Sequence, residues 1–305
     1  MRAEQIEYAG WPNCYRLASE RAELVVTADV GPRVIRFALA GDENVFKEYP
    51  EQLGSTGGDE WRIYGGHRLW HAPEAMPRTY APDNGPVAVE PRGDALRLVQ
   101  PVEATTGIQK ELDVSLAADE ARATVTHRLR NTNLWPLEVA PWAVSVMAPG
   151  GVAVVPLPPR RRHEESLVPA NTLALWAYTD MTDARWTWGA RFVLLRQQPG
   201  APAPQKAGLS VPEGWAAYAR DGRLFVKAFD YVAGGRYPDL GSNVEAFTNA
   251  EMLELETLAP LSTVPPGGEV EYTERWALFA SVPPPASDGE VEWDVLPKVR
   301  TALSG

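Results

Sequence analysis

Proline and glycine limit what this chain can fold into more than any other feature of its sequence. The 305 residues include 28 prolines and 25 glycines, about one residue in six, and they are spread along the chain. Inside an α-helix, proline costs about 3 kcal/mol and glycine about 1 kcal/mol relative to alanine. Long regular helices are therefore excluded over most of the sequence, and an all-helical protein is excluded with them.

Alternating apolar and polar residues predict strands between these helix breakers. The clearest case is residues 121–130, where Ala123, Val125, His127 and Leu129 alternate with arginine and threonine in the period of a half-buried strand. Similar runs predict strands at residues 23–28, 33–39, 95–101, 108–116, 137–147, 191–196, 223–231, 252–258 and 269–279. Turns rich in glycine, proline and aspartate separate many of these runs, which favours antiparallel pairing.

Helical spacing is confined to the C-terminus, where Val295, Leu296, Val299 and Leu303 recur at helical intervals and Pro297 suits a first turn. Two segments rich in proline and polar residues, 156–172 and 197–214, are predicted as long loops. No change in composition separates two cores, and no repeat of fixed period is present. We therefore predict one all-β domain over residues 1–305, a large antiparallel sandwich with few short helices.

The charge balance and the single cysteine bear on partners and location. Lysine and arginine number 29 against 40 aspartates and glutamates, so the formal net charge of −11 repels nucleic-acid phosphates and anionic lipids. No segment approaches the ~18 apolar residues of a membrane span, and the N-terminus lacks the apolar stretch of a secretion signal. A lone Cys14 excludes an internal disulfide. We expect a cytoplasmic protein that binds neither nucleic acid nor membranes.

The segment of residues 61–74, WRIYGGHRLWHAPE, contains a metal-like spacing. His67, His71 and Glu74 lie at i, i+4 and i+7, which on a helix would place two imidazoles and a carboxylate on one face. The Gly-Gly pair before them and Pro73 among them argue against a helix. We therefore expect no metal site from these residues.

Two other interpretations of this segment remain open. In the first, a Gly-Gly turn is followed by ordinary aromatic packing, and the histidines are hydrogen-bonded inside the protein. In the second, the segment forms a polar ligand site, in which the imidazoles and the Arg68 guanidinium act together with the indoles of Trp61 and Trp70. Eleven tryptophans are many for a chain of this length. Their flat apolar faces suit sugar rings.

The segment of residues 250–261, AEMLELETLAPL, places two carboxylates on one face of a predicted strand. Glu254 and Glu256 share a face with Met252, whereas the leucines between them point to the core. The glutamates either face solvent or face a pocket together with His67. In a pocket their mutual repulsion would raise the pKa of one carboxyl group, as proton transfer near neutral pH requires. Further polar groups are available nearby in Lys227, Asp239, Asn243 and Glu245.

The sequence contains none of the other common catalytic or cofactor-binding motifs. The sequence has no GxSxG nucleophile motif, no phosphate-binding P-loop and no GxGxxG dinucleotide motif. We therefore predict no bound cofactor.

Taken together, these segments resemble the galactose mutarotase-like superfamily, which includes aldose 1-epimerases and hexose-6-phosphate epimerases. The run IYGGHRLWHAP is similar to a Gly-Gly…Trp-Pro turn of the hexose-6-phosphate epimerase branch, MLELET to the late strand with the catalytic glutamate, and NTNLWPLEVAPWAVSV to the middle strand. The combination also resembles an uncharacterised bacterial branch. The resemblance implies an all-β fold, a large antiparallel β supersandwich.

The resemblance also implies a reaction. In that superfamily a carboxylate takes the proton of the anomeric hydroxyl while a histidine protonates the ring oxygen, and the opened sugar recloses with inversion. Glu256 matches the base, whereas Trp142 stands at the position of the acid histidine, so His67 or His71 would supply the acid. The implied substrate-binding residues are Arg68, Trp70, Trp142, Lys227 and Glu254. The alternative is a sugar-binding module without catalysis. The negative net charge favours a neutral sugar over a phosphorylated one.

Overall fold

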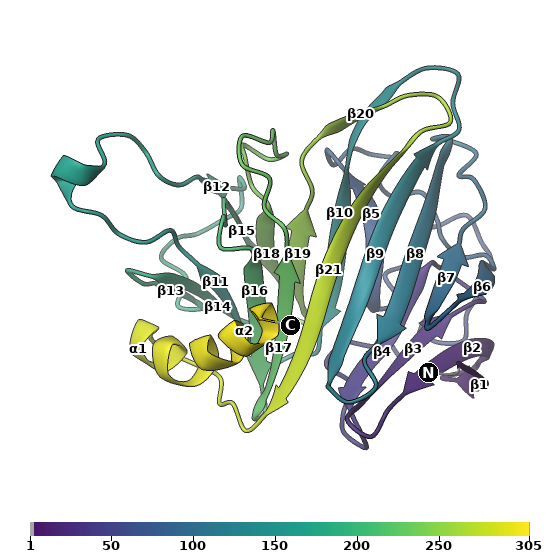
Figure 1. Ribbon diagram of the computed structural model, residues 1–305, viewed down its shortest axis with the longest axis horizontal. Helices are drawn as coiled ribbons and strands as arrows, with labels where there is room; N and C mark the ends of the chain where they lie inside the picture. The colour runs from purple at the N-terminus through teal and green to yellow at the C-terminus, as the bar shows by residue number, and fades with distance from the viewer. Residues whose placement is uncertain (1–2, 305) are drawn as a thin grey trace. The chain divides into compact units, whose positions relative to one another are not determined.

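A computed structural model describes residues 3–304 of the chain (Figure 1). Strands contain 45% of the residues and helices 6%, and the sheets are large and antiparallel. The predicted all-β fold class is therefore confirmed. Among residues 3–304 there is no helix with the length and hydropathy needed to cross a membrane.

The chain divides into two compact units. Unit 1 runs to Val146 and includes Leu261–Arg275, and unit 2 contains Met147–Pro260 and the residues from Trp276 onward. The prediction of a single domain over residues 1–305 remains a prediction.

Unit 1 contains strands of two antiparallel sheets. The first sheet has the strand order β1 (Glu4–Tyr8), β2 (Trp11–Ala18), β3 (Ala22–Thr27), β4 (Arg33–Leu39), β5 (Gly66–Ala72) and β10 (Leu137–Met147), and β20 (Ser262–Val264) also pairs with β10. The second has the order β6 (Ala88–Arg92), β7 (Ala95–Val99), β8 (Ile108–Leu116), β9 (Arg122–Asn131) and the first part of β21 (Glu269–Ala280). Side chains of β5 and β9 meet between these sheets, so the interior of unit 1 lies there.

Unit 2 likewise contains strands of two sheets. One has the order β19 (Leu253–Leu258), β18 (Val244–Thr248), β15 (Gln205–Leu209) and β12 (Leu173–Leu175). The other has the order β13 (Trp186–Trp188), β14 (Phe192–Arg196), β11 (Val152–Pro156), β16 (Trp215–Arg220) and β17 (Arg223–Phe229). The second sheet is strongly apolar, and β11 is buried along its whole length.

The C-terminal helix forms as predicted. Three short elements follow one another: α1 (Asp288–Glu290), η2 (Val291–Val295) and α2 (Leu296–Leu303). Val295 and Val299 are fully buried in the core cluster that includes Val226 of β17. Burial of each such side chain contributes about 1.5–3 kcal/mol, so packing rather than intrinsic helix propensity holds this short helix.

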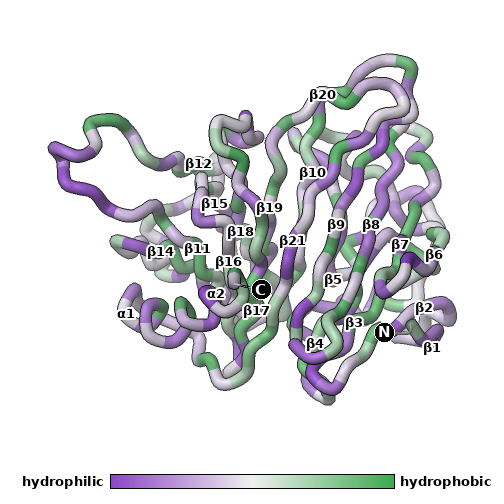
Figure 2. The backbone as a smooth tube through the Cα atoms, in the orientation of Figure 1, coloured by the Kyte–Doolittle hydropathy of each residue, from purple (hydrophilic) through white to green (hydrophobic). Residues whose placement is uncertain are grey.

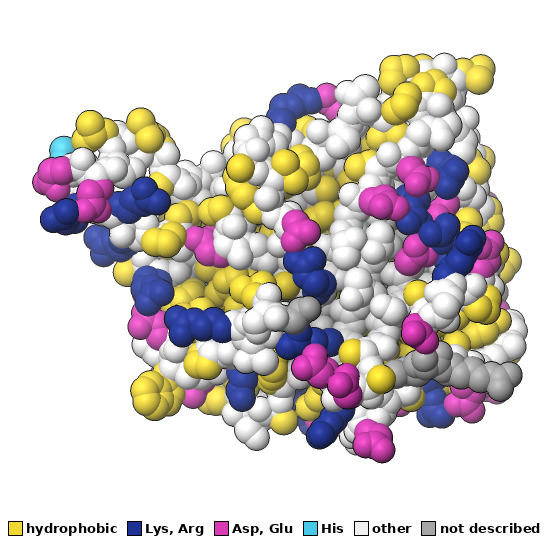
Figure 3. All heavy atoms as spheres, in the orientation of Figure 1, with side chains coloured by type: hydrophobic (Ala, Val, Ile, Leu, Met, Phe, Trp, Pro, Cys, Tyr) yellow, Lys and Arg dark blue, Asp and Glu magenta, His cyan; other side chains and the backbone are white. Residues whose placement is uncertain are grey.

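The predicted strand at residues 121–130 corresponds to β9, whose two faces differ as the alternation requires. Leu129 is buried, whereas Arg130 is half-buried and pairs with Glu111 of β8 and Glu269 of β21. Figure 2 shows hydrophilic stretches along β8 and β9, and Figure 3 shows basic and acidic side chains interspersed over these strands. The outer face of this sheet is thus covered by ion pairs.

One of the two predicted loops is wrong. Residues 157–172 form the expected long loop, with the short helix η1 (His163–Glu165) at its far end (Figure 1). Residues 197–214, however, contain the buried strand β15. Its sequence QKAGL lacks the β-branched residues that mark strands, and Gly208 is needed because a Cβ there would lie 2.4 Å from Ser242 Oγ.

We expect replacement of Gly65 by alanine to destabilise unit 1 by more than about 3 kcal/mol, because both backbone strain and a clash oppose the new side chain. Gly65 has a φ of +98°, and a Cβ there would lie 1.9 Å from the carbonyl oxygen of Lys47. Gly93→Ala is the matched control, because its φ is +62° and no atom lies within 4 Å of the added Cβ. Gly93→Ala should lower the free energy of unfolding, measured with urea, by about 1 kcal/mol. Equal decreases in the free energy of unfolding for Gly65→Ala and Gly93→Ala would show that the clash at Gly65 does not matter.

Candidate functional site

Strand β5 carries most of the site residues predicted from the sequence, and its alternation separates them into two sets. His67 and His71 lie on one face, which points to the second sheet of unit 1, whereas Arg68 and Trp70 lie on the other. The pairing with β10 preserves this division, because His67 lies opposite Ser145 and Trp70 lies opposite Trp142. The structure therefore does not bring the two histidines together with Arg68 and Trp70.

The Arg68 face of β5 is aromatic. The guanidinium lies over the rings of Trp61 and Trp70, with its central carbon 5.4 Å and 4.4 Å from the ring centroids. Trp70 also contacts Trp142 edge to face at 5.3 Å between centroids, and Tyr80 at 5.0 Å. Arg68, Trp70 and Trp142 thus lie together on this face of β5 and β10. All three are buried, so the half-buried Trp61 and Tyr80 present the accessible aromatic surface of this face.

On the opposite face of β5, His67 belongs to a chain of hydrogen bonds. Its Nε2 lies 2.7 Å from Nε2 of His127 on β9, and its Nδ1 lies 2.9 Å from Ser145 Oγ. The Nδ1 of His127 lies 2.9 Å from the carbonyl oxygen of Tyr272. The carboxylate of Glu274 approaches His67 Nε2 to 4.0 Å.

His71, four residues after His67 on the same face of β5, lies beside a buried ion pair. Its Nε2 lies 3.8 Å from Glu103, whose carboxylate binds the Lys110 ammonium at 2.6 Å and accepts a hydrogen bond from Thr106. Burial lowers the pKa of His71, so the imidazole is neutral at pH 7. Burial alone would raise the pKa of Glu103, but Lys110 and the neighbouring hydrogen bonds hold that pKa at about 2. Glu74, the third residue of the metal-like spacing, is exposed.

In unit 2, Glu256 lies in a buried cluster of three charged side chains. Glu256 of β19 lies opposite Glu245 of β18, so the two carboxyl groups share one face of the sheet. The ammonium of Lys206 on β15 lies 2.7 Å from Glu245 and 3.0 Å from Glu256. Glu254 lies two residues before Glu256 on the same face and is half-buried. The predicted common face of Glu254 and Glu256 is thus present.

Burial and mutual repulsion change the titration of this cluster. Burial raises the pKa of Glu245 well above its usual range, and Glu256 adds to the shift while Lys206 opposes it. Burial also raises the pKa of Glu256, again against the charge of Lys206. The two carboxylates in turn hold the pKa of Lys206 well above its usual value despite burial. Burial therefore favours the protonated form of both carboxyl groups, whereas the Lys206 ammonium favours their ionised form.

Trp176, which the sequence analysis did not single out, lies against Lys206 of this cluster. The ring centroid of Trp176 lies 4.7 Å from the Lys206 ammonium, and the indole is half-buried. The turn that carries it is fixed to β15, because Thr179 donates a hydrogen bond to the Lys206 carbonyl and Asp180 N–H donates to Gln205. Lys206 itself was also missed, since β15 was predicted as a loop.

Lys227 lies on β17 and is fully buried. Its ammonium donates a hydrogen bond to the carbonyl of Leu255 at 3.2 Å, one residue before Glu256 on β19. Lys227 therefore contacts the backbone of the strand that carries the glutamates.

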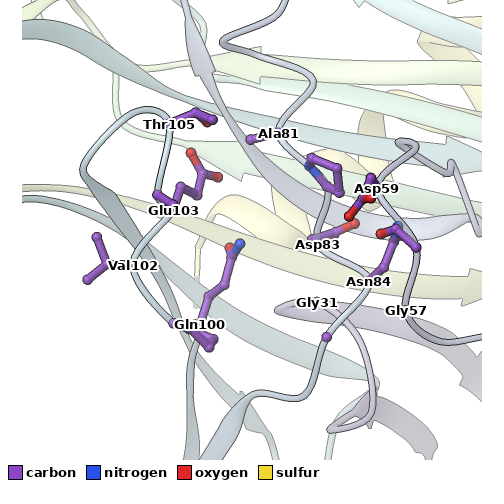
Figure 4. Close-up of a pocket in the computed structure, with 15 residues that line it drawn as sticks. Gly31, Gly57, Asp59, Ala81, Asp83, Asn84, Gln100, Val102, Glu103 and Thr105 are labelled. Atoms are coloured by element: carbon purple, nitrogen blue, oxygen red, sulfur yellow. The ribbon is translucent and has the colours of Figure 1, made fainter.

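A cavity of about 530 Å³ lies in unit 1, and none of the site residues chosen from the sequence lines it. Figure 4 shows Asp59, Asp83 and Asn84 on one side and Gln100 and Glu103 on the other. Asp83 also pairs with the buried Arg33 at 2.8 Å. The residues that line the cavity come from loops, and they form no sequence motif.

The comparisons with known proteins bear on the fold. The chain is similar in structure to a galactose mutarotase related enzyme from Lactobacillus acidophilus, with a TM-score of 0.55 and 9% identity over 90% of this chain and 98% of that one. It is also similar to a galactose mutarotase-like protein from Clostridium acetobutylicum, with a TM-score of 0.52 and 11% identity over 92% of this chain and 98% of that one. A galactose mutarotase-like protein from Lactobacillus casei has a TM-score of 0.52 and 11% identity over 88% of this chain and 100% of its own. The chain has the galactose mutarotase-like fold.

No protein-family model and no curated protein matches the sequence. The predicted supersandwich, the fold of the galactose mutarotase-like superfamily, is thus confirmed by structure rather than by sequence identity. At 9–11% identity the likeness extends to the fold alone.

Proposed function

We propose that this protein binds a neutral sugar and interconverts its anomers at the buried cluster of Glu256, Glu245 and Lys206. One observation carries the proposal: Glu256, the residue that the superfamily resemblance implies as base, lies opposite a second buried carboxyl group, Glu245, and both approach the Lys206 ammonium. An acid and a base with separated pKa values are what ring opening and reclosure require.

The reaction assigns one proton movement to each carboxyl group. Glu256 takes the proton of the anomeric hydroxyl, and the carbonyl forms as the bond to the ring oxygen breaks. Glu245 gives its proton to that oxygen. Reclosure on the other face of the carbonyl reverses both transfers. Lys206, 2.7 Å and 3.0 Å from the two carboxyl groups, stabilises whichever of them is ionised.

His67 and His71 have no part in this proposal, although either was the acid expected from the sequence. Both rings face the interior of unit 1, where His67 contacts Ser145 of β10 and His71 contacts Glu103 in the loop between β7 and β8. Glu245 takes the role of acid instead, because it shares a sheet face with Glu256.

Trp176 is the proposed platform for the apolar face of the sugar, because its half-buried indole lies against the Lys206 ammonium of the cluster. We expect Trp176→Ala to weaken sugar affinity about tenfold, as the loss of one stacking contact. The matched control is Trp188→Ala, on an indole that stacks on Trp186 in the same unit. Calorimetry or NMR titration with a panel of aldoses measures the change. Equal affinities for wild type and Trp176→Ala would contradict the assignment.

A further inference from the structure

Three side chains from three strands of unit 1 converge between its two sheets: His67 of β5, His127 of β9 and Glu274 of β21. All three are completely buried. The two Nε2 atoms lie 2.7 Å apart, and Glu274 Oε2 lies 4.0 Å from Nε2 of His67. The three potential ligand atoms all lie within 4.8 Å of one another. The proposed reaction does not use this cluster.

The far nitrogen of each imidazole has its own partner. A carbonyl oxygen only accepts hydrogen bonds, so the Nδ1 of His127 carries a proton that it donates to Tyr272. Nε2 of His127 then carries a lone pair, which it presents to Nε2 of His67. This arrangement, with one nitrogen fixed by a backbone carbonyl and the other turned inward, is the one that metal-binding histidines adopt.

The partner of His67 permits the same state. The hydroxyl of Ser145, 2.9 Å from Nδ1, can donate or accept a hydrogen bond. When it donates, His67 carries its proton on Nε2 and shares it with His127. When it accepts, the proton resides on Nδ1, and both Nε2 atoms present lone pairs to the space beside Glu274. The change is a tautomer shift within one neutral ring and releases no proton.

We propose that His67, His127 and Glu274 bind a divalent transition metal ion of the zinc class. Two imidazole nitrogens and one carboxylate form a common ligand set for this ion. The site is distinct from the i, i+4, i+7 set considered in the sequence. Of that set it keeps only His67.

The movements that metal binding requires are small. With bonds of about 2.0–2.1 Å in tetrahedral geometry, neighbouring ligand atoms lie about 3.3 Å apart. The two Nε2 atoms would separate from 2.7 Å, and the carboxylate would approach His67 from 4.0 Å, each by less than about 1 Å. Because β5 lies in one sheet and β9 and β21 lie in the other, the ion would cross-link the two sheets of unit 1.

The test is the metal content of the full chain, produced with added Zn²⁺ or Co²⁺ so that the ion is present during folding. After removal of loosely bound ions, elemental analysis should find about one equivalent per chain in the wild type. Bound Co²⁺ should show the visible absorption of a site with nitrogen and oxygen ligands. His127→Gln and Glu274→Gln should each reduce the content at least about tenfold, and Ser145→Ala should weaken affinity about tenfold.

His71→Gln is the matched control, because it removes a buried imidazole from the same face of β5 outside the cluster. It should retain the metal. Circular dichroism checks the folding of each variant, and the wild-type content alone decides the case if a variant does not fold. A folded wild type without bound Zn²⁺ or Co²⁺ overturns the proposal, as does equal metal content in wild type and His127→Gln. Either result would leave a hydrogen-bonded histidine pair.

Discussion

Glu256→Gln should lower the rate of anomer interconversion by at least about 100-fold, because the amide cannot take the proton of the anomeric hydroxyl. The substitution keeps the size of the side chain and a hydrogen-bonding oxygen toward Lys206, which lies 3.0 Å away. Sugar affinity should change far less than the rate. Exchange NMR on a saturating sugar measures the rate, and a titration measures the affinity.

The control for this variant is Glu251→Gln, which removes a carboxylate from an exposed position just before β19. Its rate should match that of the wild type. Retention of more than about one third of the wild-type rate in Glu256→Gln would contradict the assignment of the base.

The pH dependence of the rate gives a second test of the same pair. The rate should rise as Glu256 loses its proton and fall as Glu245 loses its own, giving a bell-shaped profile. Because burial raises the pKa of both groups, both limbs should lie above the usual range for a glutamate. Glu245→Gln should lower the rate and abolish the limb at higher pH. A pH-independent rate in the wild type would contradict the two-carboxyl mechanism.

Lys110→Met should destabilise unit 1 by about 3–5 kcal/mol, because it leaves the Glu103 carboxylate buried without its cation. Both side chains are almost completely buried, and the ammonium lies 2.6 Å from the carboxylate. Urea unfolding measures the loss. The double variant Glu103→Gln/Lys110→Met should recover most of the lost stability, because it removes the unpaired charge as well. Arg92→Met, which breaks an exposed pair with Glu90, should change the free energy of unfolding by less than about 1 kcal/mol.

The same pair predicts how stability depends on pH. The pKa of Glu103 is about 2 in the folded protein and near 4.5 when the chain is unfolded. A lowered folded-state pKa stabilises the protein above the unfolded value, so this contribution of about 3 kcal/mol is lost as the pH falls from about 4.5 toward 2. In Lys110→Met this acid dependence should disappear. An unchanged acid transition in that variant would show that the ion pair does not set it.

Strands with clear alternation were predictable from the sequence, and β4, β8 and β10 match their predicted bounds. The missed strands lack that pattern for physical reasons. All seven residues of β5 are buried, so its polar residues face protein on both sides and no exposed face produces an alternation. β15 contains glycine and lysine in place of β-branched residues.

For the candidate site, the sequence predicts which side chains of one strand share a face, but not which strands lie next to each other. The common face of Glu254 and Glu256 follows from a period of two, and the structure agrees. The partners Glu245 and Lys206 depend on which strands are neighbours, a property that local sequence does not determine. The contact of His67 with His127, 60 positions later, is of the same kind. No sequence motif links His67 with His127, so their contact was not predictable.

The central claim is that this protein interconverts the anomers of a sugar at Glu256. Its most direct test is two-dimensional exchange NMR on a panel of neutral aldoses with catalytic amounts of the full chain. The account predicts that at least one aldose shows exchange between its α and β anomers well above the uncatalysed rate, and that Glu256→Gln abolishes the increase. Saturable binding without any increase in exchange would instead identify a sugar-binding module and contradict the claim.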